Sequence, residues 1–134
     1  MMFSSLYFHS LDAKNRLFIP AKFREMLGEE FVLFSGPDKC LYIYDKERFE
    51  EVSQQFINHP NRAAQRSFFS NAAEVSTDKQ GRVTLSAEQL AHAGLNKDAV
   101  IVGAGKRIEI WAPENFKQAS VPLAEIDKMD TFVF

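Results

Sequence analysis

The chain has 134 residues, 46% of them hydrophobic and 13% aromatic, enough for one packed domain or two small half-domains that share a core. The single cysteine, Cys40, excludes a disulfide within the chain and fits a reducing compartment, and its apolar surroundings predict a buried, unreactive thiol. A formal net charge of -2 excludes a uniformly basic nucleic-acid-binding chain, although a local basic patch is still compatible with it.

The N-terminal third of the chain shows alternating apolar residues, then helical spacing, then two apolar runs. Gly28 follows the helical stretch and fits a helix C-cap. The pattern predicts, in order, a strand at 7–11, a turn at 12–15, a strand at 16–19, a helix at 21–27, and strands at 31–34 and 41–44.

The middle of the chain is amphipathic and helical, and the order of elements then starts again. We expect helices at 46–58 and 61–73, interrupted by Pro60. The second series consists of a strand, a turn at 78–81, a strand, a helix at 87–93, and strands near Val100 and Ile108. A further short helix is expected within 121–130.

The chain repeats itself. Asp12 and Arg16 recur as Asp78 and Arg82, 66 residues later, and apolar positions stay in step over some 38 residues. A match of this length indicates duplication, and two copies suit a pseudo-symmetric pair that shares one core. We therefore predict a first unit at 5–47, a helical linker region at 48–73, a second unit at 74–117 and a C-terminal tail at 118–134.

Each copy carries an Asp-x-x-x-Arg box on a predicted hairpin turn. Asn15 and Gly81 precede the two arginines, and both residue types tolerate positive φ, so we expect tight turns with a left-handed residue there. In one interpretation Arg16 makes bidentate hydrogen bonds to guanine or phosphate, while the aspartate stabilises the turn. In the other, each Asp–Arg pair only stabilises its turn, as an exposed ion pair that contributes about 0–1 kcal/mol.

The sequence gives little support for catalysis, metal binding or base stacking. Asp12 and Asp78 each have an arginine nearby that keeps the carboxylate ionised, so they are poor candidates for acid–base catalysis. Three histidines (His9, His59 and His92) lack the spacing of metal ligands. The Phe68-Phe69 pair is typical of a core or subunit interface more than of base stacking. We expect no enzyme activity, no cofactor, no metal and no small-molecule substrate.

The N-terminus lacks the basic and apolar regions of a signal peptide, and no run is long enough to span a membrane. We therefore expect a cytoplasmic protein with no membrane partner. Charge is unevenly spread: the segment from Asp12 to Arg24 carries a local net charge of +3. A basic patch on an otherwise neutral body is the expectation.

The residues that carry both boxes, together with a trailing Glu-Ile-Trp strand, resemble the MraZ family. The resemblance covers roughly Met1 to Phe116 and rests on three segments in order: 7–24, 78–82 and 108–111. It implies a mixed α+β, mainly β fold with two tandem SpoVT-AbrB domains. These are swapped-hairpin half-barrels that form one pseudo-symmetric barrel with flanking helices.

The resemblance also implies a function. Members of this family regulate transcription as ring-shaped homo-oligomers that bind repeated boxes upstream of the division and cell-wall gene cluster, which here implies double-stranded DNA as the partner and a nucleoid-associated location. The implied DNA-binding residues are Lys14, Asn15, Arg16, Lys22, Arg24, Lys79, Gln80 and Arg82, and the implied structural turn residues are Asp12, Asp78 and Gly81.

Both copies depart from the family pattern, the first at Asn15 and the second at Ser86 and Gln89-Leu90. Asn15 stands where the family usually has Gly, Ser86 where Pro is expected, and Gln89-Leu90 where Leu-Arg is typical, so Leu90 supplies no cation. Two alternatives stay open at this point. One is an AbrB-like antitoxin that binds a toxin as well as DNA, and the other is an oligomeric structural protein with no nucleic-acid partner.

Overall fold

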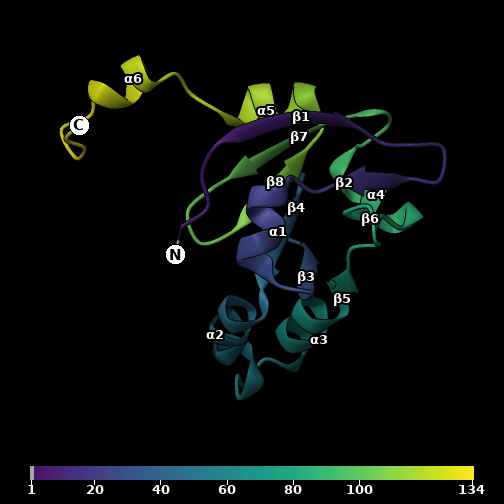
Figure 1. Cartoon of the computed structure of the whole chain (residues 1–134). Helices are drawn as coiled ribbons and strands as arrows, with labels where there is room; N and C mark the ends of the chain where they lie inside the picture. The colour runs from purple at the N-terminus through teal and green to yellow at the C-terminus, as the bar shows by residue number, and fades with distance from the viewer. Residues whose placement is uncertain (1) are drawn as a thin grey trace.

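A computed structural model describes residues 2–134, which form mixed α+β structure (Figure 1). The first copy comprises β1 (Leu6–Ser10), β2 (Arg16–Phe18), α1 (Ala21–Leu27), β3 (Glu30–Ser35), β4 (Leu41–Asp45), α2 (Lys46–Ile57) and α3 (Arg62–Ser70). The second comprises β5 (Ala72–Ser76), β6 (Arg82–Thr84), α4 (Ala87–Ala93), β7 (Asp98–Gly103), β8 (Ile108–Trp111), α5 (Pro113–Ala119) and α6 (Leu123–Asp127).

The strands form two antiparallel sheets whose order reveals an exchange between the copies. The larger sheet has the order β1-β7-β8-β4-β3-β5, and the smaller is the ribbon β2-β6. The first strand of each copy therefore pairs with the other copy: β1 with β7, and β5 with β3. A pseudo-two-fold axis runs between β4 and β8, and neither copy completes its own sheet alone.

The strand exchange confirms the mixed α+β class with two intimately paired copies. The hydrogen-bonded pairing within residues 2–134 gives one open six-stranded sheet and a separate ribbon, not a closed ring of strands. The ribbon is held to the sheet by side-chain packing instead, because Leu17 and Val83 face each other across it and are fully buried.

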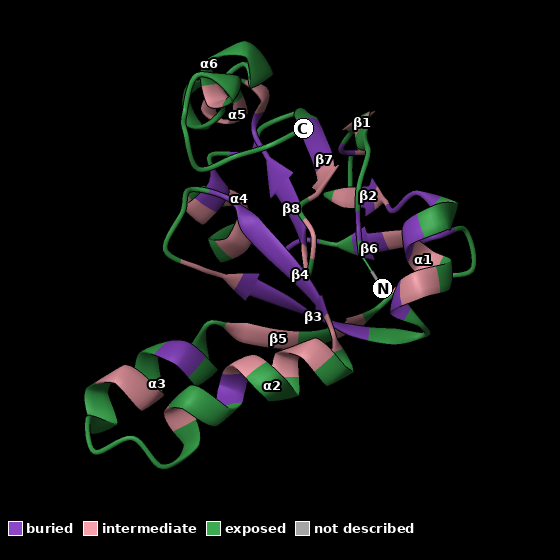
Figure 2. Ribbon diagram, turned by 90° about the vertical axis from the view of Figure 1, so that its left-hand side faces the viewer, coloured by how far each residue is buried: buried purple, intermediate pink, exposed green. Residues whose placement is uncertain are grey.

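The larger sheet is buried on both faces, as the central strands in Figure 2 show. One face packs against the ribbon and α1 through aliphatic side chains such as Ile43, Ile101 and Ile110. The other face is aromatic, including Tyr44 and Trp111. Burial on both faces explains why β3, β4 and β7 contain continuous apolar runs rather than alternating sequences.

Helices α2, α3 and α5 cover the aromatic face. Asp45 and Asn61 cap α2 and α3, since their side chains accept hydrogen bonds from backbone N–H groups three residues on. Phe68 of α3 stacks on the ring of Phe56 in α2, with centroids 4.1 Å apart. The α2–α3 pair is thus a small helical layer that belongs to the first copy.

Most sequence-based element predictions are confirmed within a residue or two, including both short helices at 21–27 and 87–93. The helix expected at 61–73 ends earlier, at Ser70, because Ala72 begins β5, which pairs with β3. Helix α5 was not predicted, and α6 is shorter than the segment proposed for it. None of the helices in residues 2–134 has the length and apolarity needed to span a membrane.

Candidate nucleic-acid interface

The first Asp-x-x-x-Arg box is a hairpin turn built around the Asp12 carboxylate. One oxygen, Oδ1, accepts hydrogen bonds from the backbone N–H groups of Lys14 and Arg16, both at 2.9 Å. The other oxygen, Oδ2, accepts from Arg16 Nε at 2.7 Å. Asn15 has φ +58°, the left-handed conformation predicted for it. The carboxylate therefore holds the backbone of the turn and the direction of the arginine together.

The second box reproduces this geometry. Asp78 Oδ1 accepts from the backbone N–H groups of Gln80 and Arg82 at 2.9 Å, and Oδ2 accepts from Arg82 Nε at 2.9 Å. Gly81 has φ +81°. In each box the hydrogen bond from the arginine backbone N–H is the largest contribution lowering the pKa of the aspartate. Both carboxylates are therefore ionised at neutral pH, and each accepts hydrogen bonds from the backbone of its own turn.

The ribbon brings the two boxes side by side. Strands β2 and β6 pair with Arg16 opposite Thr84 and Phe18 opposite Arg82. Because side chains alternate along a strand and Leu17 is buried, these four residues share the outer face. Arg82 Nη1 also lies 3.7 Å from Asp12 Oδ2, so one carboxylate contacts both arginines. The arginines predicted from separate copies thus form one site.

Arg24 links the first copy to the turn of the second. Its Nε donates to the Ile19 carbonyl at 2.9 Å, and its guanidinium carbon lies 5.2 Å from the centre of the Phe18 ring. The guanidinium also lies against Gly81, where a Cβ would come within 2.7 Å of that carbon. Gly81 is therefore required both by its positive φ and by the approach of Arg24.

The same contact explains the two departures in the repeat pattern. Position 90 in α4 is equivalent to Arg24 in α1, and position 15 is equivalent to Gly81. The backbone N–H of Leu85 donates to the Asn15 carbonyl, just as Ile19 donates to Gly81. Where the helix position is Leu90, no guanidinium lies over the turn, and a side chain at Asn15 is accommodated. The two departures are therefore structurally linked, because the absence of an arginine at position 90 leaves room for the side chain of Asn15.

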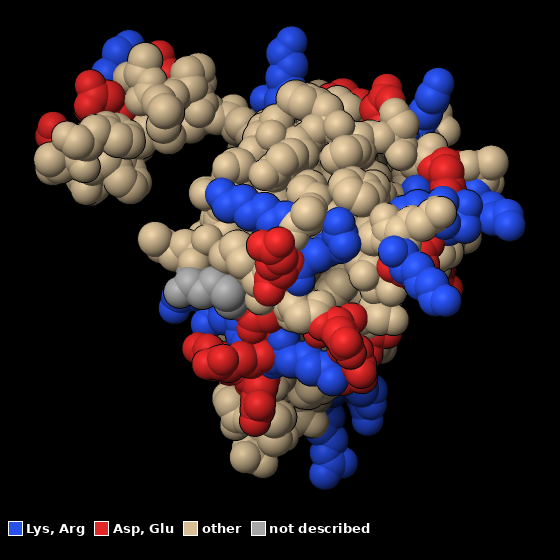
Figure 3. Space-filling model, in the orientation of Figure 1, with Lys and Arg blue, Asp and Glu red and all other residues tan. Residues whose placement is uncertain are grey.

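The remaining predicted residues surround this ribbon. Lys14, Lys22, Lys79 and Gln80 have exposed side chains, whereas Arg16, Arg24 and Arg82 are half-buried. Figure 3 shows lysine and arginine side chains gathered at the end of the molecule where β2 and β6 lie. Six basic side chains stand there against the two box carboxylates, which makes this end locally cationic on a chain of net charge -2.

A second polar cluster lies beneath the aromatic sheet face. Ligand-type atoms of Asp38, Cys40 and Glu109 fall within 4.8 Å of one another. Both carboxylates are already paired: Asp38 accepts from the Tyr42 hydroxyl, and Glu109 accepts from Trp111 Nε1 at 2.9 Å and pairs with a neighbouring arginine. Burial raises the pKa of the Cys40 thiol far above its usual range. The buried position predicted for Cys40 from the sequence is confirmed.

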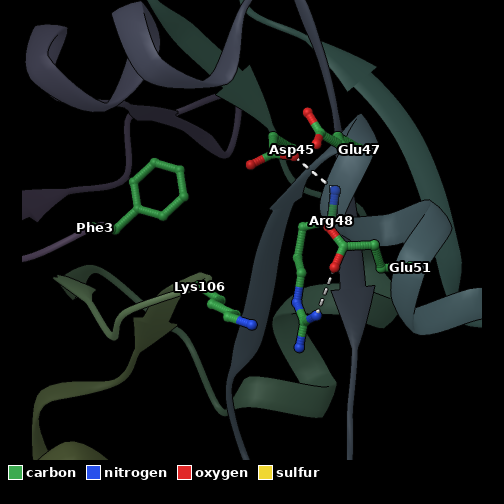
Figure 4. Close-up of a pocket in the computed structure, with 6 residues that line it drawn as sticks. All are labelled: Phe3, Asp45, Glu47, Arg48, Glu51 and Lys106. Atoms are coloured by element: carbon green, nitrogen blue, oxygen red, sulfur yellow. Dashed lines mark hydrogen bonds and ion pairs between the residues drawn. The ribbon is translucent and has the colours of Figure 1, made fainter. Parts of the chain in front are cut away.

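A pocket of about 180 Å³ lies at the start of α2, where Arg48 and Lys106 meet three carboxylates (Figure 4). Arg48 pairs with Glu51 at 3.4 Å, and the positive and negative side chains of the pocket largely offset each other. A hollow in the second copy is lined by Lys39, Asn115 and Gln118 among others, and Asn115 and Gln118 stand at the positions equivalent to Arg48 and Glu51, so this ion pair has no counterpart there. The box geometry is shared by both copies, but this pocket is not.

Comparison with known proteins agrees with the duplicated architecture. The profile of the family described as "MraZ protein, putative antitoxin-like" matches twice, at residues 2–67 and 68–132. The chain belongs to the MraZ family. The two MraZ repeats meet close to the start of β5, which separates the two copies found in the strand order. The family is one of transcriptional regulators, not of enzymes.

Individual relatives cover almost the same span. The transcriptional regulator MraZ of Heliobacterium modesticaldum is 46% identical over 122 residues, covering 87% of this chain and 85% of the relative. That of Clostridium tetani is 44% identical over 122 residues, covering 87% and 86%. That of Clostridium acetobutylicum is 42% identical over 133 residues, covering 93% and 94%.

Sequence reasoning missed two participants in this site. Phe18 supplies the ring beneath Arg24 and contacts His9 of β1. Thr84 stands opposite Arg16 on the outer face of the ribbon. Their strand positions were predicted, but nothing in the repeat indicates that β2 and β6 pair with each other. That pairing brings these residues to the site.

Proposed function

We propose that this chain is a sequence-specific, double-stranded-DNA-binding transcriptional regulator. The observation that carries the proposal is the joining of two Asp-x-x-x-Arg boxes on one ribbon, where Asp12 contacts both Arg16 and Arg82. The two guanidinium groups are hydrogen-bonded at their Nε atoms, and of their outer nitrogens only Arg82 Nη1 lies near a carboxylate, so N–H groups are left for the paired acceptors of guanine or for phosphate oxygens. The names of the relatives support regulation of transcription.

Different residues take different parts in this proposal. Arg16 and Arg82 are the base or phosphate readers, and Asp12 and Asp78 orient them. Four exposed polar residues at the turns contact the DNA backbone: Lys14, Asn15, Lys79 and Gln80. Lys22, at the start of α1, contacts it beside them. Arg24 supports the second turn through Gly81 and adds positive charge, so the first copy contributes more cations than the second.

We further propose that the protein acts as a homo-oligomer, arranged as a ring, on repeated boxes upstream of the division and cell-wall gene cluster. A single cationic ribbon on a chain of net charge -2 binds DNA weakly. Several ribbons on neighbouring boxes raise the affinity by effective concentration, by about a hundredfold or more. Sheet and ribbon would act together as one barrel-like support, and the site of action would be the nucleoid in the cytoplasm.

The test compares wild type with Arg16→Ala and Arg82→Ala on a DNA fragment with closely spaced direct repeats and on a scrambled fragment. Loss of one guanine-reading arginine is expected to cost about 1–3 kcal/mol of binding free energy, or roughly 5- to 150-fold in affinity. Fluorescence anisotropy at several salt concentrations measures both the affinity and the salt slope.

Lys117→Ala is the matched control, because Lys117 is an exposed cation on α5. It should leave binding unchanged. Equal binding of wild type to repeat and scrambled DNA would remove the regulator proposal. If binding prefers repeats but neither arginine variant weakens it, the ribbon is not the contact surface.

A further inference from the structure

We propose that the C-terminal segment 121–134 docks into an apolar groove of a second copy of this chain, the groove formed by α2, α3 and the turn after β3. We call these the tail and the α3 groove. The proposal deepens the homo-oligomer proposed above by naming the contact that builds it. Its test measures mass without DNA, so its failure is separable from failure of DNA binding.

The tail is apolar and has nothing to pack on within its own chain. Six large hydrophobic side chains in these 14 residues are exposed: Val121, Leu123, Met129, Phe132, Val133 and Phe134. Phe134 is 77% exposed and Val133 96%. None of the residues 121–134 belongs to either buried cluster or to the side chains packed against them. Exposed apolar surface this concentrated marks a contact with another molecule.

The α3 groove offers the complementary surface. It has a volume of about 340 Å³ and is open along one side. Apolar side chains form most of its wall, among them Phe34 and Pro37 from the sheet side and Phe56, Ala64 and Phe68 from the helices. The rings of Phe34 and Phe68 lie 4.9 Å apart and form its floor. Further aromatic side chains would extend this aromatic cluster.

The tail and helix α3 carry opposite net charges. The tail carries Asp127 and Asp130, and within residues 2–134 neither forms an ion pair, whereas its Lys128 already pairs with Glu125. Helix α3 carries Arg62 and Arg66, which are exposed and equally unpaired among the described residues. Ala64 and Ser67 of the same helix line the groove, and helical spacing places Arg62 and Arg66 on the opposite side of α3. The arginines are therefore not part of the groove wall, but the opposite charges of the tail and of α3 favour their approach.

The geometry requires two molecules. The tail leaves the fold beside α5, while α2 and α3 lie at the opposite end, as both Figure 1 and Figure 2 show. A tail that fills the groove of a neighbour leaves that neighbour's tail free for a third copy. Such a contact is heterologous, or head-to-tail, and it repeats until a ring closes.

The fold itself suggests why the tail has no partner in its own chain. In the first repeat, α2 continues unbroken for 12 residues, and α3 folds back onto it. In the second repeat, α5 has only 7 residues and is followed by Pro122, which redirects the chain before α6. The tail thus occupies the sequence position of α3 but points away from its own sheet.

The experiment uses two full-length variants that break opposite halves of the contact. Phe132→Ser/Phe134→Ser removes exposed rings from the tail, and Ser67→Glu puts a bulky anion into the groove. Both changes are at exposed positions and leave the core intact. Static light scattering on a sizing column gives the mass against the 15.3 kDa of one chain. Far-ultraviolet circular dichroism verifies folding.

Wild type is expected to elute as an oligomer and each variant as a monomer. Mixing the two variants in equal amounts should give a species of twice the monomer mass. The intact tail of the groove variant fits the intact groove of the tail variant, and no third copy can add. Met2→Ser and Ala63→Glu are the matched controls, one an exposed apolar side chain elsewhere and one on α3 outside the groove. Both should keep the wild-type mass.

Three results would overturn the proposal. A monomeric wild type at tens of micromolar would mean that the tail binds in cis or a different protein. Wild-type mass in either variant would mean that another surface builds the oligomer. Monomers that stay apart after mixing would mean that tail and groove do not meet.

Discussion

Gly81 and Arg24 should be energetically coupled, because a Cβ at position 81 would lie 2.7 Å from the Arg24 guanidinium carbon. We consider Gly81→Asn, since Asn already occupies the equivalent turn position, Asn15, with φ +58°. Asn adopts the left-handed conformation routinely, so its backbone cost is small. The main cost is displacement of Arg24 from the Ile19 carbonyl, about 1–2 kcal/mol for a charged hydrogen bond that is half-exposed.

The Arg24→Leu background reproduces the arrangement of the first turn, where Leu90 takes the helix position. There Gly81→Asn should cost less than about 0.5 kcal/mol, which leaves a coupling free energy of about 1 kcal/mol between the two positions. Urea unfolding followed by the fluorescence of the single tryptophan, Trp111, measures all four proteins at one concentration. Additive effects of the two substitutions would refute the argument that the guanidinium dictates glycine here.

Three further predictions follow from burial and titration. Ile43→Ala should cost about 2–5 kcal/mol of unfolding free energy, since this side chain of the central strand β4 is fully buried; urea unfolding measures it. Cys40 should not react with a thiol reagent until denaturant is added, because it is buried and its thiol pKa is strongly raised. The pKa values of Asp12 and Asp78 are lowered on folding from the ordinary 3.8, so both carboxylates stabilise the fold above that pH. This stabilisation should disappear as the pH falls through their folded pKa values, and an Asp12→Asn/Asp78→Asn variant should lose less stability than wild type between pH 7 and pH 3 in urea titrations.

Much of the fold could be predicted because the duplication repeats local signals. The helix at 21–27 ends at Gly28, and its counterpart at 87–93 ends at Gly94, so two independent patterns supported each boundary. The boundary of α3 could not be found in this way. Ala72 and Ala73 favour a helix by propensity, but β3 offers them a free strand edge, and tertiary pairing prevails over propensity.

The turn geometry of the candidate site could also be predicted, since Asp at the first position and Asn or Gly before Arg dictate it locally. The meeting of the two boxes could not. It depends on β2 and β6, three residues each, and strands this short carry no sequence signal for their partner. The contact between Arg24 and Gly81 likewise joins residues 57 positions apart, and only the paired departures at Asn15 and Leu90 hint at it.

Strand exchange makes the candidate interface a property of the whole chain, not of either repeat. Arg16 is held by Asp12 of its own repeat, but β2, the strand that Arg16 begins, pairs with β6 of the other repeat. Arg82 in turn reaches Asp12, and the turn before it is supported by Arg24 of the first repeat. A change in one box therefore alters the presentation of the other. The second repeat has no arginine at position 90, yet it borrows cationic support from the first. The two boxes are consequently best regarded as one asymmetric site, in which the first repeat provides the scaffold and most of the positive charge.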